Sequence, residues 1–326
     1  MSKKVNLNDK HLIVLWAACQ CGGYFIDQIS ELTGLIDDTV RSLLDEMIEF
    51  GVIQRRAFLD VRRLGYVVTR YYLELNQFGQ SKRGLILEFL KHHKSVSYLT
   101  AYNDGKTLQI GVVADDHHES RYVFEEMIDK FGETIESLEF HIMDEMHDFG
   151  VNLLGMKAKH PRVLSFKNHG SDGKCLRLRV KHRDMLSTLS GWHYKHKKEL
   201  AKKIGRTPSH VTTTTNALKA LYIYLGDRFV MDTPKTNFHA KTLLVNSPNI
   251  CKSFQRRLIE YVENEPALHY IAVLMGEWRF EIGLTTKTEH EGNSAIDKLK
   301  SHFQNEISEF SEFQMEDFVK VAQHPF

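Results

Sequence analysis

Apolar residues along the chain follow two spacings, which alternate in blocks. A spacing of three and four residues predicts amphipathic helices. These helices span Leu12–Gly22, Ile29–Leu35, Asp37–Gly51, Met185–Tyr194, Leu200–Arg206 and Thr207–Gly226. The third helix of each trio stops at a glycine, where a left-handed C-cap is expected. Each trio precedes an extended basic segment, VIQRRAFLDVRRLGY or DRFVMDTPKTNFH. This order is typical of a winged helix-turn-helix.

The segments after each trio alternate with a period of two and then return to helical spacing. The first copy reads VVTRYYLEL, KRGLILEFLKHH, a hairpin turning near Asp104-Gly105, SRYVFEEMIDKFGETI and SLEFHIMDEM. The second copy has the same order, with its hairpin turning near Gly276. Both read βαββαβ, which predicts a ferredoxin-like sandwich with two helices on one face of an antiparallel sheet. The sequence therefore predicts an α+β protein of two tandem units.

The internal repeat sets the expected domain boundaries. We expect a first winged helix-turn-helix over residues 1–64 and a first ferredoxin-like domain over 65–154. A Gly-, Lys- and His-rich linker follows over 155–174. The second winged helix-turn-helix then spans 175–238, and the second ferredoxin-like domain spans 239–326.

Composition is that of a soluble globular protein, with 326 residues, 42% hydrophobic and 26% charged. No apolar run reaches the roughly 18 residues needed to cross a bilayer, and the first ten residues lack the apolar core of a signal peptide. We therefore expect a cytoplasmic protein with no membrane partner. Cys19 and Cys21 stand alone as a pair on a predicted helix, which favours core positions. No metal and no cofactor are predicted.

Charge is segregated along the chain. Residues 174–240 hold 14 Lys and Arg against 4 Asp and Glu, whereas the blocks on either side are mildly acidic. This asymmetry predicts a polyanionic partner, most often nucleic acid. We expect that partner to be double-stranded DNA.

The second helix-turn-helix has the composition of a DNA-reading head. Thr207 is expected to cap its third helix, with Pro208 in the first turn. Val211, Leu218, Leu221 and Tyr222 are expected on the buried side. Base edges or phosphates would then meet Ser209, His210, Thr212, Thr213 and Asn216. Phosphate contacts are expected from Lys195, Lys197, Lys198, Lys202, Lys203, Arg206, Arg228 and Lys235.

The first helix-turn-helix has the opposite charge. From Tyr24 to Phe50 it holds seven acids, with Arg41 as its one cation. Phosphate would repel such a helix, so a structural or protein-contact role is favoured. A weaker alternative is that the arginines of its extended segment contact the DNA backbone.

This order of elements resembles the Lrp/AsnC (feast/famine) family of transcription regulators. The resemblance covers nearly the whole chain twice and is carried by LNDKHLIVL, by LGY, and by the hairpins NDGKTLQIGV and MGEWRFEIGL. Members of the family dimerise through their sheets, so the resemblance implies a pseudo-dimer within one chain and a homo-oligomer, dimer or higher.

The same resemblance implies a small-molecule effector near the glycine hairpins, at Gly105 and Gly276. The family's common Gly-x-x-Asp pattern is absent from both hairpins, because Lys-Thr-Leu follows Gly105 and Glu-Trp-Arg follows Gly276. Arg279 offers a bidentate partner for an effector carboxylate instead.

The resulting interpretation is a DNA-binding transcription regulator that is not an enzyme and has no catalytic residues. The sequence holds no phosphate-cradling glycine loop, no H-E-x-x-H and no nucleophile elbow. Two alternatives stay open. Sirohaem decarboxylases resemble the same fold and use histidines and arginines around a tetrapyrrole, and this chain holds 18 histidines. A protein-binding adaptor would also account for the acidic first copy.

Overall fold

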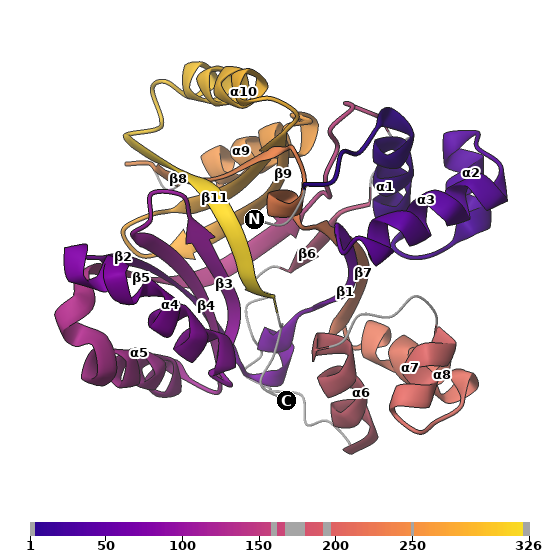
Figure 1. Ribbon diagram of the computed structural model, residues 1–326, viewed down its shortest axis with the longest axis horizontal. Helices are drawn as coiled ribbons and strands as arrows, with labels where there is room; N and C mark the ends of the chain where they lie inside the picture. The colour runs from indigo at the N-terminus through magenta and orange to yellow at the C-terminus, as the bar shows by residue number, and fades with distance from the viewer. Residues whose placement is uncertain (1–3, 158–161, 167–179, 192–196, 249–250, 322–326) are drawn as a thin grey trace.

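The computed structural model describes residues 4–157, 162–166, 180–191, 197–248 and 251–321 (Figure 1). The predicted fold class is confirmed, because helical heads alternate with βαββαβ units twice along the chain. Lys195, which was expected to contact phosphate, lies outside the described residues, and so does most of the predicted linker.

The first head consists of α1 (Asp9–Cys21), α2 (Ile26–Thr33) and α3 (Asp37–Glu49). Asn8 caps α1 by accepting a hydrogen bond from the backbone N–H of His11, and Gly22 ends the helix with a φ of 70°. The three helices bury an apolar core around Leu15, Ile29 and Leu44. Cys19 lies in this core, as its helical position predicted.

The second head consists of α6 (Val180–Gly191), α7 (Lys197–Lys203) and α8 (Pro208–Ala220). Thr207 caps α8 as predicted, because its side chain accepts from the N–H of His210. The threonine run is divided between two faces. Thr214 and Thr215 are buried, and the Thr215 hydroxyl donates to the Val211 carbonyl at 2.9 Å. A hydroxyl bonded in this way within the helix needs no other partner.

The end of this second head departs from the prediction. The third helix was expected to reach Gly226, but α8 ends at Ala220 and a strand begins at Tyr224. Between them Tyr222 adopts a left-handed φ of 56°. Tyr222 was also expected to be buried, and its side chain is 63% exposed instead. The left-handed residue turns the chain out of the helix before its ring can reach the core.

The two extended segments predicted as separate wings pair with each other. β1 (Ile53–Leu59) and β7 (Tyr224–Met231) form an antiparallel two-stranded sheet that joins the two heads, here called the hinge sheet. Arg55 and Asp227 form a buried ion pair across it at 2.6 Å. Short 3₁₀ turns, η1 (Val61–Leu64) and η3 (Thr233–Lys235), lead from the hinge sheet into the domains that follow.

The two βαββαβ units share one sheet. The first unit holds β2 (Val67–Leu75), α4 (Gln77–His92), β3 (Val96–Tyr102), β4 (Thr107–Ala114), α5 (His117–Phe131), the turn η2 (Gly132–Thr134) and β5 (Ile135–Asp148). The second holds β8 (His239–Asn246), α9 (Lys252–Asn264), β9 (Leu268–Met275), β10 (Phe280–Thr286), α10 (Glu289–His302) and β11 (Glu309–Val321). The turns predicted near Asp104-Gly105 and Gly276 lie where expected, between β3 and β4 and between β9 and β10.

These strands close on themselves. The order is β2-β4-β3-β11-β8-β10-β9-β5, and β2 pairs with β5 as well. The two units meet at β3–β11 and at β5–β9, and the short β6 (Leu164–Phe166) adds to the end of β5. Helices α4 and α5 cover one half of this closed sheet, and α9 and α10 cover the other (Figure 1). Because side chains alternate along a strand, the other face of every strand points into the closed sheet.

Candidate ligand site at the mouth of the closed sheet

A cavity of about 210 Å³ lies between the hinge sheet and one open end of the closed sheet. The hinge sheet contributes Phe58 and Arg228, and the strands below contribute Tyr98 and Tyr270. Much of the lining is apolar, including Val68, Met143, Phe166 and Phe318. Five cationic side chains line it against two acidic ones. The cations are Arg56, Arg62, Arg70, Arg228 and Lys241, and the acids are Asp60 and Asp148. Arg62, Arg70, Arg228 and Lys241 are each ion-paired, with Asp60, Glu281, Asp148 and Glu312 respectively. The cavity therefore favours a ligand with apolar surface, and an acidic group on that ligand would share these cations with the protein's own acids.

An arginine N–H group in this lining lacks an acceptor among the described residues. The Nη2 of Arg62 is buried and makes no hydrogen bond there, whereas the Nε of Arg70 is paired with a carboxylate. Arg62 is held in place because its Nε lies 3.2 Å from an oxygen of Asp60 and its Nη1 donates to the Asp144 carbonyl. Arg70 lies 3.5 Å from Glu281, which is an ion-pair distance. A buried N–H donor without an acceptor costs about 1–3 kcal/mol, so a ligand that supplies an acceptor gains that energy.

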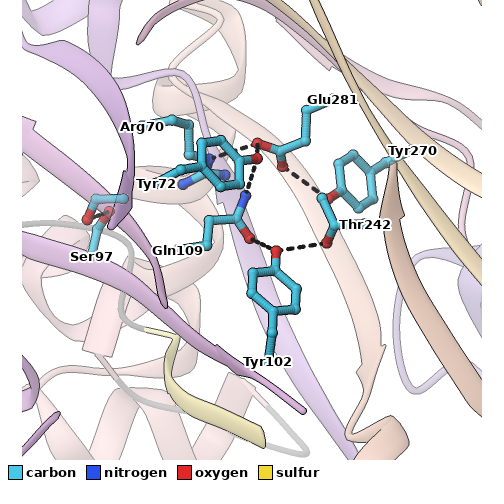
Figure 2. Close-up of polar contacts among 9 residues, drawn as sticks. Arg70, Tyr72, Ser97, Tyr102, Gln109, Thr242, Tyr270 and Glu281 are labelled. Atoms are coloured by element: carbon cyan, nitrogen blue, oxygen red, sulfur yellow. Dashed lines mark hydrogen bonds and ion pairs between the residues drawn. The ribbon is translucent and has the colours of Figure 1, made fainter. Parts of the chain in front are cut away.

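A hydrogen-bonded network lies behind the cavity, inside the closed sheet (Figure 2). Glu281 is buried and accepts from Tyr270 at 2.8 Å and from Tyr72 at 2.7 Å. The Tyr72 oxygen accepts from the Gln109 amide, whose carbonyl lies 2.9 Å from the Tyr102 hydroxyl. This network satisfies both carboxylate oxygens of Glu281 and fixes the Tyr270 ring at the cavity floor.

Two glycines make room for the cavity floor. A Cβ at Gly111 would collide with the Arg70 guanidinium, and one at Gly283 would collide with the Tyr270 ring. Both glycines follow an inward polar residue by two positions, Gln109 in QIG and Glu281 in EIG. The repeat therefore places matched features on β4 and β10.

One histidine and two tyrosines at this site are kept uncharged by burial. Burial lowers the pKa of His269 to about 4, so its imidazole is neutral at pH 7. Burial also raises the pKa of Tyr98 to about 12 and that of Tyr270 well above its usual range. The cavity thus offers a neutral imidazole, which is the form that binds metals, and phenols that retain their protons.

The site predicted for DNA lies on a different surface, the second head. Of the residues expected to meet bases, Ser209, Thr213 and Asn216 are exposed, as is Thr207, while His210 and Thr212 are half-buried. Lys197, Lys198, Lys202, Lys203 and Arg206 are exposed as well. These side chains share the outward face of α7, α8 and the turn between them.

Arg228 and Lys235 do not belong to that surface. Arg228 is 2% exposed; its Nε lies 3.0 Å from Asp148, and its other nitrogens donate to the carbonyls of Cys19, Asp148 and Arg162. It therefore links β7 to α1 and to the end of β5, and its buried guanidinium cannot reach phosphate. Lys235 is half-buried, with its ammonium 3.2 Å from the Gly51 carbonyl and 2.8 Å from Asp232. Pairing of β7 with β1 buries Arg228, whereas Lys235 follows β7 on η3 and keeps part of its side chain exposed.

The effector residues expected from the glycine hairpins are also elsewhere. Gly105 forms the turn between β3 and β4 with a φ of 75°, and Gly276 lies against His141 in the turn after β9. Arg279 is half-buried and follows that turn. None of the three is among the residues that line the cavity. The signal that would have found the cavity is the inward alternation of polar residues and glycine on β4 and β10, in QIG and EIG.

Comparison with known proteins gives matches to solved structures alone. No family model matches the chain, and no curated protein matches it. The crystal structure of the siroheme decarboxylase NirDL covers 97% of this chain and 94% of its own, with a TM-score of 0.55 and 11% identity. NirDL in complex with an iron-uroporphyrin III analogue gives 0.56 and 10%, covering 97% and 93%. AsnC from E. coli covers 42% of this chain and 92% of its own, with a TM-score of 0.35 and 16% identity.

The chain thus shares the fold of NirDL over nearly its whole length. One expectation from the sequence, that the chain is not an enzyme, is corrected by this finding, because the full-length structural match is to an enzyme. The absence of common catalytic motifs from the sequence does not exclude an enzyme, because NirDL is an enzyme with this fold.

Proposed function

We propose that the chain is an enzyme that binds a tetrapyrrole carboxylate in the cavity at the mouth of the closed sheet and removes carboxyl groups as CO₂. The observation that carries this proposal is the buried Nη2 group of Arg62, which lines an apolar cavity and has no acceptor among the described residues. Carboxylates are the acceptors that arginine binds best. The NirDL structures support the choice of substrate class.

The lining suits such a substrate in two further respects. Tyr98, Tyr270, Phe58 and Phe166 offer aromatic faces for a flat ring system. His269 is neutral at pH 7 because burial lowers its pKa to about 4, so it can approach an iron atom carried by the substrate. The chemistry of these residues therefore suits an iron-bearing macrocycle with acidic side chains, and the cavity of about 210 Å³ must widen to admit one.

The chain's own groups define what they contribute to the reaction. Arg62 and Arg70 would hold a substrate carboxylate, while the surrounding apolar residues keep water away from it. Breaking the C–C bond releases CO₂ and leaves the electron pair on the substrate carbon, which must take up a proton. Tyr98 lines the cavity, and its hydroxyl is protonated at neutral pH, with a pKa that burial raises to about 12. It is the proton donor that we propose, with solvent restoring its proton afterwards.

Iron-uroporphyrin III tests this proposal as a ligand and as a substrate. We expect its visible absorption spectrum to shift when the protein is added, and we expect anaerobic incubation to release CO₂. Ala240→Phe places a ring in the cavity. We expect this variant to bind iron-uroporphyrin III about tenfold or more weakly, as measured by the spectral shift. Ala220→Phe, at an exposed position on α8, is the matched control and should bind as the wild type does.

The two readouts separate binding from catalysis. An unchanged spectrum with the wild-type protein would contradict the proposed substrate class. A spectral shift without CO₂ would remove the decarboxylation and leave a tetrapyrrole-binding protein.

A second candidate function is binding of duplex DNA through the second head, in a tandem of two Lrp/AsnC-type units. The supporting observation is that Lys198, Lys202, Lys203 and Arg206 are exposed and make no ion pair among the described residues. Cations that have no acidic partner and recur every three to four residues can bind the phosphates of a DNA backbone. In this proposal Ser209, Thr213 and Asn216 on α8 face the bases.

Substituting two of these cations gives a direct measurement. Lys202→Ala/Lys203→Ala should weaken binding to a random duplex and lower the slope of log affinity against log salt by about 2, because two phosphate contacts are lost. Lys252→Ala/Lys298→Ala removes the same charge from exposed positions on α9 and α10 and should leave both quantities unchanged. Fluorescence anisotropy at several salt concentrations measures them. A wild-type protein that shows no binding at low salt would contradict this function.

A further inference from the structure

The first head carries an exposed surface that is both acidic and apolar. Its acids are Asp27, Glu31, Asp37, Asp38 and Glu49, and its apolar residues are Phe25, Leu32, Ile36 and Phe50. We call these residues the acidic face. Ile36 is 72% exposed and Phe50 is 54% exposed. Large apolar side chains exposed among charged ones are typical of protein–protein contact sites.

Nothing in the described part of the chain neutralises this surface. Those five acids make no salt bridge with any described residue, and Arg41 is the one cation on α2 and α3. In Figure 1, α2 and α3 lie at the outer edge of the molecule, away from the helices that cover the closed sheet. The acidic face is therefore available to another molecule.

The complementary surface is on the second head of the same chain. Lys198, Lys202, Lys203 and Arg206 are exposed on α7 and the turn after it, with no salt bridge among the described residues. We call these four residues the basic face. The basic face occupies the position in the second head that the acidic face occupies in the first, because α7–α8 and α2–α3 are matching parts of the repeat. Within one molecule the two faces belong to separate heads, and no described ion pair joins them.

We propose that the acidic face binds the basic face of a second copy of this chain. Opposite charges bring the heads together, and Ile36 and Phe50 lose contact with water when the faces meet. The contact is heterologous, because it joins two different surfaces of identical molecules. It also covers the cations proposed to bind DNA, so self-association and DNA binding compete for the basic face.

Charge reversal tests this contact, and mixing the two reversed variants should restore association. Sedimentation velocity of the wild-type protein at low salt should show association that high salt reverses. Asp37→Lys/Asp38→Lys and Lys202→Glu/Lys203→Glu should each weaken association by about tenfold or more and sediment as monomers. A mixture of the two variants should associate, because one retains a basic face and the other an acidic face. Lys252→Glu/Lys298→Glu, on α9 and α10, is the matched control and should associate as the wild type does.

The outcomes separate this contact from the other proposals. The Asp37→Lys/Asp38→Lys variant should keep DNA affinity while losing self-association, whereas the Lys202→Glu/Lys203→Glu variant should lose both. Far-UV circular dichroism and binding of iron-uroporphyrin III report whether each variant is folded. A wild-type protein that stays monomeric at low salt would overturn the contact. Variants that each still associate alone, or a mixture that does not associate, would overturn it as well.

Discussion

Replacing Arg55 with Met is expected to lower the free energy of unfolding by about 3–5 kcal/mol. Arg55 donates from Nε and Nη2 to one oxygen of Asp227, at 3.1 and 2.6 Å, and both side chains are buried in the hinge sheet. The single substitution leaves a carboxylate in a region with little water, and its desolvation is no longer offset. Urea unfolding followed by circular dichroism measures the change.

A double variant distinguishes the cost of a stranded charge from a loss of packing. Arg55→Met/Asp227→Leu removes both charges, and we expect it to recover most of the stability lost in the single variant. If the double variant is as unstable as Arg55→Met, the ion pair is not the source of the effect. Asp227→Asn should be destabilising in the same way as Arg55→Met, because it leaves a buried guanidinium.

A second large effect is expected on the dependence of stability on pH. His141 is fully buried beside the Tyr72 ring, and burial lowers its pKa to about 4. In the unfolded chain its pKa is near 6.5, so between pH 6.5 and 4 the unfolded state binds a proton that the folded state does not. Stability should therefore fall as the pH drops through this range, by about 3 kcal/mol from His141 alone.

The variant His141→Phe isolates this contribution. Phenylalanine keeps an aromatic ring against Tyr72 but has no group to protonate. The difference in unfolding free energy between the variant and the wild type should therefore shrink or reverse as the pH falls from 7 to 4. The variant retains the part of the pH dependence due to His269, whose pKa is also lowered to about 4. Two parallel curves of stability against pH would contradict this prediction, because they would show that His141 has the same pKa in the folded and unfolded states.

The internal repeat made the local elements predictable, because it supplied each pattern twice. The three-helix heads, the cap at Thr207 and the turns near Gly105 and Gly276 follow from residue type and spacing. Such features depend on contacts within a few residues, which a single sequence displays directly.

The pairing of distant segments was not predictable in the same way. β1 and β7 are separated by more than half of the chain, and either could have formed its own wing. Pairing with β1 buries Arg228, which the sequence presented as one more cation in a basic segment. The cavity depends on the same pairing, because it needs the hinge sheet above and strands of both units below. No local pattern specifies which strands will meet.

Covalent linkage of the two units changes what substitution can do to the molecule. In a dimer of identical chains every mutation appears twice, at symmetry-related positions, and both heads must change sign together. Here both units contribute strands to the hinge sheet and to the closed sheet, yet each head has its own segment of sequence. One head could therefore become acidic while its counterpart stayed basic, and Glu281 could replace the amide of Gln109 on one side of the floor alone. The two heads can differ in charge because they are separate segments of one chain, whereas a dimer of identical chains has two identical heads.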